Sequence, residues 1–361
     1  MAARRIGVIT AGGDCPGLNA VIRAVVKKAV NDFGAEAVGF LDGFRGLVLD
    51  HHTPLTYESV SSIIGVGGTI LGSSNRDNPF QFYYDDDQKE PVDASQKALD
   101  TYERHGLSAL ICIGGDGTLS MSHEFCKKGL KIVGVPKTID NDVQGTDQTF
   151  GFDSAVATAC DALDKIRTTA ASHHRAMVVE LMGRTAGWLT LFAGIATGGD
   201  IILIPEMPFS AEGVCGFVKR RSEKGRRYSI LCVAEGAHES GKDQVLLEGK
   251  GKRTGMVRLG GIGQAVAEMV QENTGVEART TVLGHIQRGG SPTTFDRILA
   301  TRYGAHAIQL AMDGVSGVTV CLKGGTIDQF PLDKVANNPR RVSPDSEFVR
   351  VARSTGAYLG E

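Results

Sequence analysis

Two short apolar segments, each followed at once by glycine or acidic residues, most restrict what this chain can fold into. Residues 109–113 (ALICI) run into residues 114–118 (GGDGT), and residues 132–135 (IVGV) run into residues 136–142 (PKTIDND). Apolar runs of this length, bounded by turn residues, are typical of buried strands in a parallel sheet. The sequence therefore predicts two strands whose ends carry a phosphate-sized glycine turn and a pair of carboxylates beside a lysine.

The beginning of the chain repeats the pattern of strand, glycine turn and helix. Residues 6–10 are an apolar run, residues 11–17 contain three glycines, and residues 18–30 carry apolar side chains at helical spacing. This order predicts an α/β fold of the nucleotide-binding type. Glycine turns before helices also serve packing alone, so this unit by itself does not define a ligand site.

Composition limits the class of protein and its partners. A chain of 361 residues, 42% of them hydrophobic, favours two domains with moderate cores. Its 39 basic and 41 acidic residues give a net charge of -2, so no overall field favours nucleic acid or an acidic membrane. Seven scattered cysteines without a CxxC pair, no signal peptide and no apolar run near ~18 residues predict a soluble, cytoplasmic protein with reduced thiols.

Further polar side chains follow other predicted strands, where open α/β sheets bind ligands. Arg76 ends a glycine-rich turn at residues 67–76, and an arginine in that position can neutralise phosphate charge. Phe44 lies in another exit loop, where it can either stack on a base or fill the edge of a core. The strand-end candidates are Asp116, Thr138, Asp140, Asp142, Arg184, Glu235, His285 and Arg288, with Arg76, Arg175 and Arg279 close by in sequence.

These residue types suit phosphoryl transfer. One carboxylate can remove the proton of a substrate hydroxyl, and another can hold Mg²⁺ against the transferring group. Asp140 and Asp142 alternate along a segment expected to be extended, so both can point into one cleft; alternatively, the segment is a turn with capping carboxylates. The chain has no GxxxxGK[ST], which excludes a lysine P-loop, and GGDGT alone also occurs in NAD kinases and lipid kinases.

Six motifs together resemble the 6-phosphofructokinase family over residues 4–325: GGDCPGLN, GGTILGSS, GGDGT, PKTIDND, MGR and LGHIQRGGSP. The resemblance implies transfer of a phosphoryl group to the 1-hydroxyl of fructose 6-phosphate. It implies two Rossmann-like three-layer α/β domains with mostly parallel sheets and the active site in the cleft between them. The expected donor domain is residues 1–140 with 255–305, the expected sugar-phosphate domain is 141–254 with 306–340, and 341–361 form a tail.

The resemblance also implies a role for each matching residue. Asp140 would be the base, with Thr138, Asp142 and Arg184 as the other catalytic residues, and Asp116 would hold Mg²⁺. The implied donor-binding residues are Gly13, Phe44, Arg76, Gly115, Asp116, Gly117, Thr118 and Lys137. The implied sugar-phosphate residues are Thr138, Asp140, Asp142, Arg175, Met182, Gly183, Arg184, Glu235, Arg279, His285 and Arg288, with Arg175 and Arg279 supplied by a neighbouring subunit of a homodimer or homotetramer.

Two positions bear on the phosphoryl donor. Pyrophosphate-using relatives look like GGDD followed by PKTIDND, whereas allosteric bacterial ATP enzymes look like GGDG followed by PGTIDND. This chain combines Gly117 from one pattern with Lys137 from the other. An aspartate at 117 would repel the α-phosphate of ATP, whereas Lys137 suits either donor, so ATP is favoured over pyrophosphate.

Regulation is expected to be weak. Basic residues that line an effector site in the allosteric relatives have counterparts here in Arg23, Lys27, Arg167, Lys224 and Arg226. Tyr57, however, stands where those relatives have an arginine, and the loss of one phosphate clamp predicts weak or absent control by ADP and phosphoenolpyruvate.

Two other classes of protein are alternatives. A catalytically inactive nucleotide sensor would bind the same ligands but would not need Asp140. A nucleoside or NAD kinase would share GGDGT but would not need the arginines and the histidine of the 175–288 region.

Overall fold

The chain folds into two compact units. The computed structural model describes residues 4–85, 87–250 and 257–360. Unit 1 consists of Met1–Asp153 and Arg288–Pro339, and unit 2 of Ser154–Gln287 and Arg340–Glu361. Among the helices described, none has the length and apolarity needed to cross a membrane.

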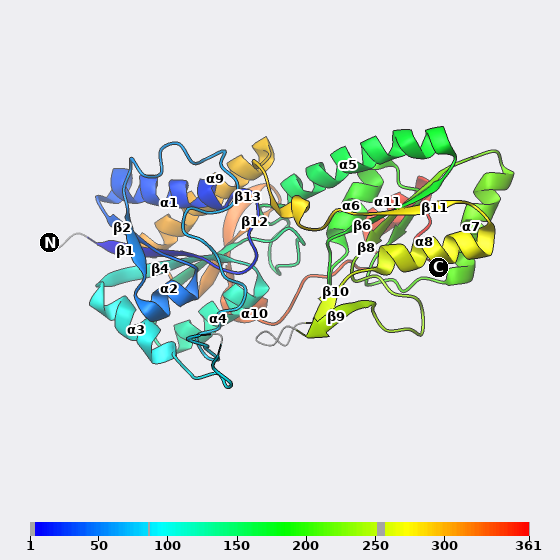
Figure 1. Cartoon of the computed structure of the whole chain (residues 1–361). Helices are drawn as coiled ribbons and strands as arrows, with labels where there is room; N and C mark the ends of the chain where they lie inside the picture. Colours follow the sequence, from blue (N-terminus) through cyan, green and yellow to red (C-terminus); the bar gives the residue numbers. More distant parts are fainter. Residues whose placement is uncertain (1–3, 86, 251–256, 361) are drawn as a thin grey trace. The chain divides into compact units, whose positions relative to one another are not determined.

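Unit 1 is built on a mixed but mainly parallel sheet (Figure 1). Within the described residues it has seven strands, in the order β13-β12-β5-β4-β1-β2-β3. They are β1 (Arg5–Thr10), β2 (Glu36–Phe40), β3 (His52–Leu55), β4 (Leu107–Gly114), β5 (Ile132–Pro136), β12 (Val318–Lys323) and β13 (Thr326–Pro331). Among the described strand pairs of this sheet, only the edge pairs β2–β3 and β12–β13 are antiparallel, and the connection between β12 and β13 is too short for the crossover that parallel pairing requires.

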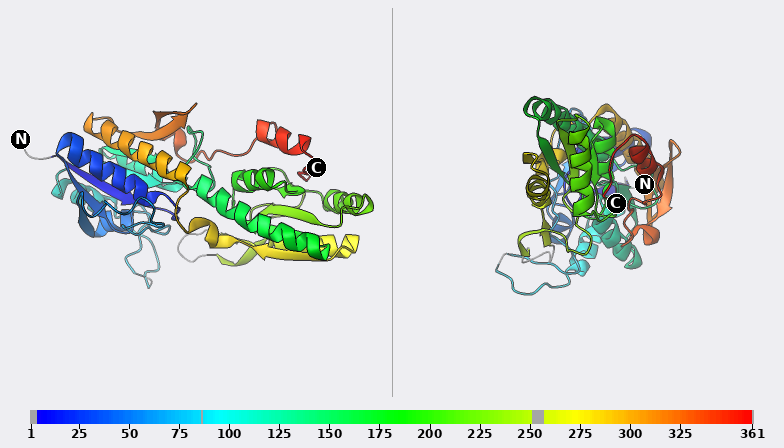
Figure 2. Two further views of the ribbon diagram at one scale, coloured as in Figure 1. Left: turned by 90° about the horizontal axis from the view of Figure 1, so that it is seen from above. Right: turned by 90° about the vertical axis from the view of Figure 1, so that its right-hand side faces the viewer.

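Helices cover both faces of this sheet. The helices α1 (Leu18–Phe33) and α9 (Thr294–Met312) pack against each other, as Figure 2 shows in blue and orange. Their close approach depends on Gly304, because a Cβ there would lie 2.7 Å from the carbonyl oxygen of Val21. A second core joins the strands to α2 (Phe44–Leu49), α3 (Ser95–Arg104) and α4 (Asp116–Lys127). A short helix, α10 (Leu332–Val335), packs on α4.

Unit 2 has a parallel sheet of its own in the order β11-β6-β8-β7. Its strands are β6 (Ala176–Leu181), β7 (Ile201–Leu203), β8 (Ser229–Ala234) and β11 (Ala278–Val282), and a hairpin is formed by β9 (Leu246–Lys250) and β10 (Val257–Leu259). Its helices are α5 (Phe152–His173), α6 (Trp188–Thr197), α7 (Ala211–Glu223), α8 (Ile262–Thr274) and α11 (Glu347–Ser354). The helices α7 and α8 share a core with the sheet, whereas α11 packs on α6. The predicted α/β class with mostly parallel sheets is therefore confirmed.

The expected domain boundaries differ from the two units. Strand β11 pairs with β6, so the end of the 255–305 segment up to Gln287 belongs to unit 2. Strand β12 pairs with β5, so residues 306–339 belong to unit 1. The tail belongs to unit 2, where Ile202 donates its N–H to the carbonyl of Tyr358 at 2.9 Å. The expected boundary at 254/255 lies outside the described residues. Pairing between strands far apart in sequence leaves no local pattern, which explains the difference.

Candidate active site

The strand order of unit 1 identifies where a ligand would bind. The strands β1 and β4 are neighbours, yet β1 leads into α1 and β4 leads into α4, which pack in different cores. Open α/β sheets bind ligands outside the carboxyl ends of strands at such a switch in direction. The turn at Gly12 and Gly13 follows β1, and residues 115–118 follow β4. The two strand exits are joined by a hydrogen bond of 3.0 Å from the N–H of Ala11 to the carbonyl of Ile113.

Two cationic side chains lie against the first glycine turn. The buried Lys137 donates a hydrogen bond from Nζ to the carbonyl oxygen of Gly13. A Cβ on Gly13 would lie 1.7 Å from Nη1 of Arg288, so the guanidinium occupies the space that a side chain would need. Burial, followed by the charge of Arg288, lowers the pKa of Lys137. The turn thus has a positively charged lining suited to phosphate.

The second glycine turn forms the beginning of α4. Asp116 and Gly117 lie in the first turn of this helix, where backbone N–H groups are available to an anion. Thr118 is buried beneath Gly114, and Gly117 is exposed. A Cβ built on Gly117 meets none of the described atoms within 4 Å. The space beside Gly117 is therefore open, as the preference for ATP requires.

The segment after β5 is held by a buried network. The Thr138 hydroxyl accepts a hydrogen bond from the N–H of Asp140 at 3.0 Å. Asn141 has a φ of 52° and is anchored through Oδ1, which accepts from the N–H of Thr149 at 3.0 Å. The Thr149 hydroxyl donates to the Thr138 carbonyl at 2.8 Å. The expectation of an extended segment is therefore wrong at Asn141, whose left-handed backbone makes a sharp turn between the two aspartates.

Asp116 and Asp142 form an electrostatically strained pair. Among the described residues, Oδ1 of each is shielded from solvent and has no hydrogen-bond partner. Burial, followed by the charge of Asp142, raises the pKa of Asp116 to about 6. Burial is also the main reason that the pKa of Asp142 is raised. Carboxylate oxygens left without donors near each other fit a hard divalent cation such as Mg²⁺.

This pair predicts a pH dependence of stability in the absence of Mg²⁺. The folded-state pKa of Asp116, about 6, exceeds the unfolded value of about 3.9. The folded state therefore binds the proton more tightly, and stability should fall as pH rises from about 4 through 6. Asp116→Asn should remove this part of the slope, and added Mg²⁺ should stabilise the parent more at pH 7 than at pH 5. Thermal unfolding with and without Mg²⁺ measures the pH dependence of stability and the effect of the ion. If stability changed with pH equally in the parent and in Asp116→Asn, the electrostatic interaction of Asp116 with Asp142 would be contradicted.

In unit 2 the exits of β6 and β8 lie side by side. Glu235 donates its N–H to the carbonyl of Leu181 at 2.8 Å, and Gly236 donates to Gly183 at 3.1 Å. A Cβ on Gly236 would lie 2.0 Å from the carbonyl oxygen of Arg184. The structure thus brings together the predicted residues Met182, Gly183, Arg184 and Glu235.

Gly236→Ala is expected to destabilise unit 2 by about 2 kcal/mol or more, because the obstructing atom is backbone oxygen and cannot move as a side chain can. Urea unfolding measures the change. Gly216→Ala in α7 is the matched control: its Cβ would meet only Nη1 of Arg220, at 3.2 Å, so helix propensity should make it neutral or slightly stabilising. Equal urea midpoints for the two variants would show that the ends of β6 and β8 can move apart without loss of stability.

The remaining predicted residues of unit 2 lie in two places. Arg175 and Arg279 both bind the exposed Glu277, at 2.9 and 2.5 Å. They therefore lie on adjacent strand ends, since β11 pairs with β6. His285 is exposed in the short helix η1 (Gly284–Arg288).

Two predicted donor residues have different outcomes. The Phe44 side chain is 1% exposed and stacks on Phe125 with ring centroids 5.6 Å apart, so in this structure the ring fills the core of unit 1. Arg76 is exposed, and its loop is fastened to the first glycine turn. The Ser73 hydroxyl donates to the carbonyl of Gly12 at 2.6 Å, and Gly12 donates to the carbonyl of Ser74 at 2.9 Å.

Two positioning residues were missed in the sequence. Asn19 is fully buried, donates to the carbonyl of Val66 at 3.0 Å and accepts from the N–H of Ile70 at 2.9 Å. It therefore holds the loop that carries Arg76. Gln287 is also buried and accepts from the N–H of Met182 at 3.0 Å. An amide on the apolar face of a predicted helix was a usable signal for Asn19, whereas nothing local distinguished Gln287.

The parallel sheets, the glycine turns at a switch point and the acidic pair define a phosphotransferase of the α/β class. Residues 5–311 match the family described as Phosphofructokinase. The chain belongs to the phosphofructokinase family.

Three similar proteins show how this family compares with the chain. The chain is 48% identical over 360 residues to the ATP-dependent 6-phosphofructokinase of Chloroflexus aurantiacus, and the match covers 99% of this chain and 98% of that protein. The chain is also 49% identical over 342 residues to the pyrophosphate–fructose 6-phosphate 1-phosphotransferase of Amycolatopsis methanolica, and this match covers 94% of the chain and 97% of that protein. The crystal structure of Pichia pastoris phosphofructokinase in the T-state superposes with a TM-score of 0.81 and 31% identity, covering 99% of this chain but only 37% of the longer yeast chain.

Proposed function

We propose that this protein is a 6-phosphofructokinase that transfers the γ-phosphoryl group of ATP to the 1-hydroxyl of fructose 6-phosphate. The observation that carries the proposal is the acidic pair formed by Asp116, in the first turn of α4, and Asp142, at the end of the Thr138–Asp142 segment. This arrangement combines a phosphate-binding helix end, a cation site and a third carboxylate, Asp140, that can accept a proton.

Each group has a distinct task in the proposed reaction. The Asp140 carboxylate takes the proton of the sugar hydroxyl, and the hydrogen bond from its N–H to Thr138 keeps the residue in place. Lys137 and Arg288 offset phosphate charge at the Gly13 turn. The N–H groups of the first turn of α4 bind donor phosphate. Asp116 and Asp142 would hold Mg²⁺, which supplies charge neutralisation of the transferring group when bound.

ATP is the proposed donor, with pyrophosphate as the alternative. Relatives of nearly equal identity bear names of both kinds, so identity does not separate the donors. The open space at Gly117 favours ATP, because nothing in it opposes an α-phosphate. Lys137 does not discriminate between the two donors, because a buried cation attracts the phosphate groups of ATP and of pyrophosphate alike.

The sugar phosphate is proposed to contact Met182, Gly183, Arg184, Glu235, His285 and Arg288. Arg175 and Arg279, which share Glu277, are proposed to act in a neighbouring subunit of a homodimer or homotetramer. Large apolar side chains exposed on α9, Phe295 at 44% and Ile298 at 56%, support self-association. The proposed location is the cytoplasm.

Weak allosteric control is also proposed. The Lys27 ammonium lies 3.8 Å from the centre of the Tyr57 ring, so the tyrosine covers a cation that would otherwise be open to an anionic effector. ADP and phosphoenolpyruvate should leave the rate curve against fructose 6-phosphate hyperbolic. Tyr57→Arg should raise effector affinity about 10-fold or more. Steady-state rates with each effector measure this, and a strongly sigmoidal parent curve relieved by ADP would contradict it.

A coupled assay for fructose 1,6-bisphosphate, run with ATP and then with pyrophosphate, tests the function. Product formation that requires Mg²⁺ and proceeds with ATP supports the proposal. Turnover with pyrophosphate alone would replace ATP with the alternative donor. Binding of ATP and fructose 6-phosphate without product from either donor would indicate a non-catalytic sensor.

A further inference from the structure

Two histidines and an aspartate meet in unit 1 at a place that no predicted donor or sugar-phosphate residue occupies. Asp50 caps the C-terminal end of α2, His52 begins β3, and His105 lies between α3 and β4. Oδ1 of Asp50 is 2.6 Å from Nε2 of His105 and 3.2 Å from Nδ1 of His52. The three ligand-type atoms all lie within 4.8 Å of one another.

These separations suit a small transition-metal ion. Zinc binds histidine nitrogen at about 2.0–2.1 Å and carboxylate oxygen at about 2.0–2.2 Å, in tetrahedral geometry. Two such ligands then lie about 3.3 Å apart, as follows from the tetrahedral angle. The Asp50–His52 separation of 3.2 Å already meets this value, and the Asp50–His105 separation of 2.6 Å must widen by less than 1 Å, on the order of one side-chain adjustment.

Outer contacts hold the three side chains in place. Arg104 donates to the other carboxylate oxygen of Asp50, Oδ2, at 2.6 Å, which leaves Oδ1 facing the imidazoles. The His105 ring packs edge-on against the buried Phe40, with centroids 5.6 Å apart, and the two imidazoles lie edge to face at 4.4 Å. Fixed outer contacts of this kind orient ligands and reduce the ordering that metal binding requires.

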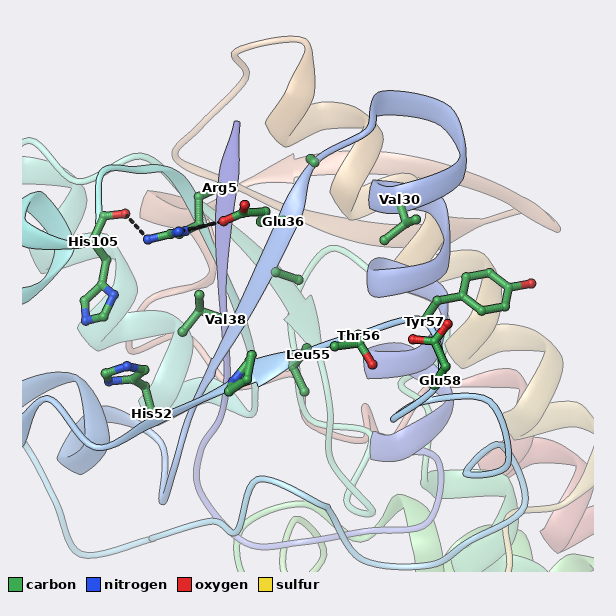
Figure 3. A pocket seen from close by; sticks show the side chains of 13 residues that line it. Arg5, Val30, Glu36, Val38, His52, Leu55, Thr56, Tyr57, Glu58 and His105 are labelled. Atoms are coloured by element: carbon green, nitrogen blue, oxygen red, sulfur yellow. Dashed lines mark hydrogen bonds and ion pairs between the residues drawn. The ribbon is translucent and has the colours of Figure 1, made fainter. Parts of the chain in front are cut away.

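One side of the cluster is open to an additional ligand. His52 and His105 face each other at one end of a groove of about 730 Å³ that also includes Val38, Leu55 and Tyr57 (Figure 3). The His105 side chain is 12% exposed and that of His52 is 38% exposed. A water molecule or a small anion can therefore reach a metal ion held there and fill its fourth position.

We propose that Asp50, His52 and His105 form a site for a divalent transition-metal ion of the Zn²⁺ type, separate from the acidic pair at Asp116. Two nitrogen ligands and one oxygen favour Zn²⁺ or Co²⁺ over Mg²⁺ and Ca²⁺, which prefer all-oxygen sites. The ion would join the turn after α2 to the turn before β4, and so link segments 53 residues apart or more along the chain through one centre.

Titration of the metal-free full chain with Co²⁺ in excess Mg²⁺ tests the site. Mg²⁺ occupies oxygen-rich sites, whereas tetrahedral Co²⁺ with nitrogen ligands has a visible absorption band. One equivalent should bind with this band and be displaced by Zn²⁺. His52→Ala should weaken binding by about 100-fold or more, since loss of an outer contact alone costs about 10- to 100-fold. His51→Ala is the matched control, because His51 is the exposed neighbour and lies outside the cluster.

A second variant, His105→Gln, and a second measurement, the unfolding temperature with Zn²⁺, test the metal site independently of the first titration. His105→Gln keeps a polar group against Phe40 and should also lose the band, and circular dichroism reports whether it folds. Should it not fold, His52→Ala decides alone. Zn²⁺ should raise the unfolding temperature of the parent and of His51→Ala, but not of His52→Ala. Absence of the band in the parent, or equal Co²⁺ affinity in the parent and His52→Ala, would reduce the cluster to a hydrogen-bonded turn contact and overturn the proposal.

Discussion

Replacing Asp140 with asparagine is expected to lower kcat by about 10²- to 10⁴-fold, the usual contribution of a positioned general base. The amide keeps the shape of the side chain but cannot take the proton of the sugar hydroxyl. The N–H of residue 140 still reaches the Thr138 hydroxyl, so the backbone of the segment should stay in place. The KM values for both substrates should therefore change far less than kcat.

Steady-state kinetics with ATP and fructose 6-phosphate measures this effect. Asp100→Asn is the control, because Asp100 is an exposed carboxylate on α3 outside the site. It removes the same charge and should leave kcat unchanged. An Asp140→Asn variant that turns over as fast as the parent would show that another group accepts the proton, and the proposed mechanism would fail.

Gly117→Asp is expected to reduce kcat/KM for ATP by about 30- to 1000-fold. A carboxylate about 4 Å from the α-phosphate, in a partly desolvated site, costs about 2–4 kcal/mol of repulsion. The protein itself should tolerate the change, because a Cβ at 117 meets no described atom within 4 Å. An acidic side chain in the first turn of α4 also interacts favourably with the helix dipole. Turnover with pyrophosphate, which has no α-phosphate, should change much less.

The matched control is Gly117→Asn, which has nearly the same size and no charge. It should lose several-fold less ATP activity than the aspartate variant if charge repulsion is the cause. Initial rates at varied ATP and at varied pyrophosphate separate the two donors, and urea unfolding checks that both variants fold. Unchanged ATP kinetics in Gly117→Asp would remove the basis for preferring ATP.

The glycine turns and the acidic segment could be predicted because their signals are local. An apolar run that breaks into GGDGT specifies a buried strand, a sharp turn and a helix start within ten residues. The same holds for β5 and the PKTIDND segment that follows it. The motif alone left an extended segment and a turn as alternatives at Asn141, because the bend depends on a hydrogen bond from the N–H of Thr149, which lies beyond the motif.

Side-chain environments were harder to predict than strand ends. Phe44 has an aromatic ring in a loop next to a strand, a pattern compatible with either base stacking or core packing. Its contact with Phe125, from a helix about 80 residues further along the chain, decided between the two. Likewise, no local pattern indicated that Arg288 would lie against Gly13 in unit 1.

The sequence by itself determined the α/β class, the phosphate-binding turns and the family, because each depends on short runs of residues whose spacing sets backbone geometry. Tertiary structure alone decided the strand order, the division into units, the pairing of Asp116 with Asp142 and the meeting of Asp50 with His105. The physical reason is that burial and charge interaction depend on which segments come within a few ångströms in space, and parallel sheets bring together segments that are far apart in the chain.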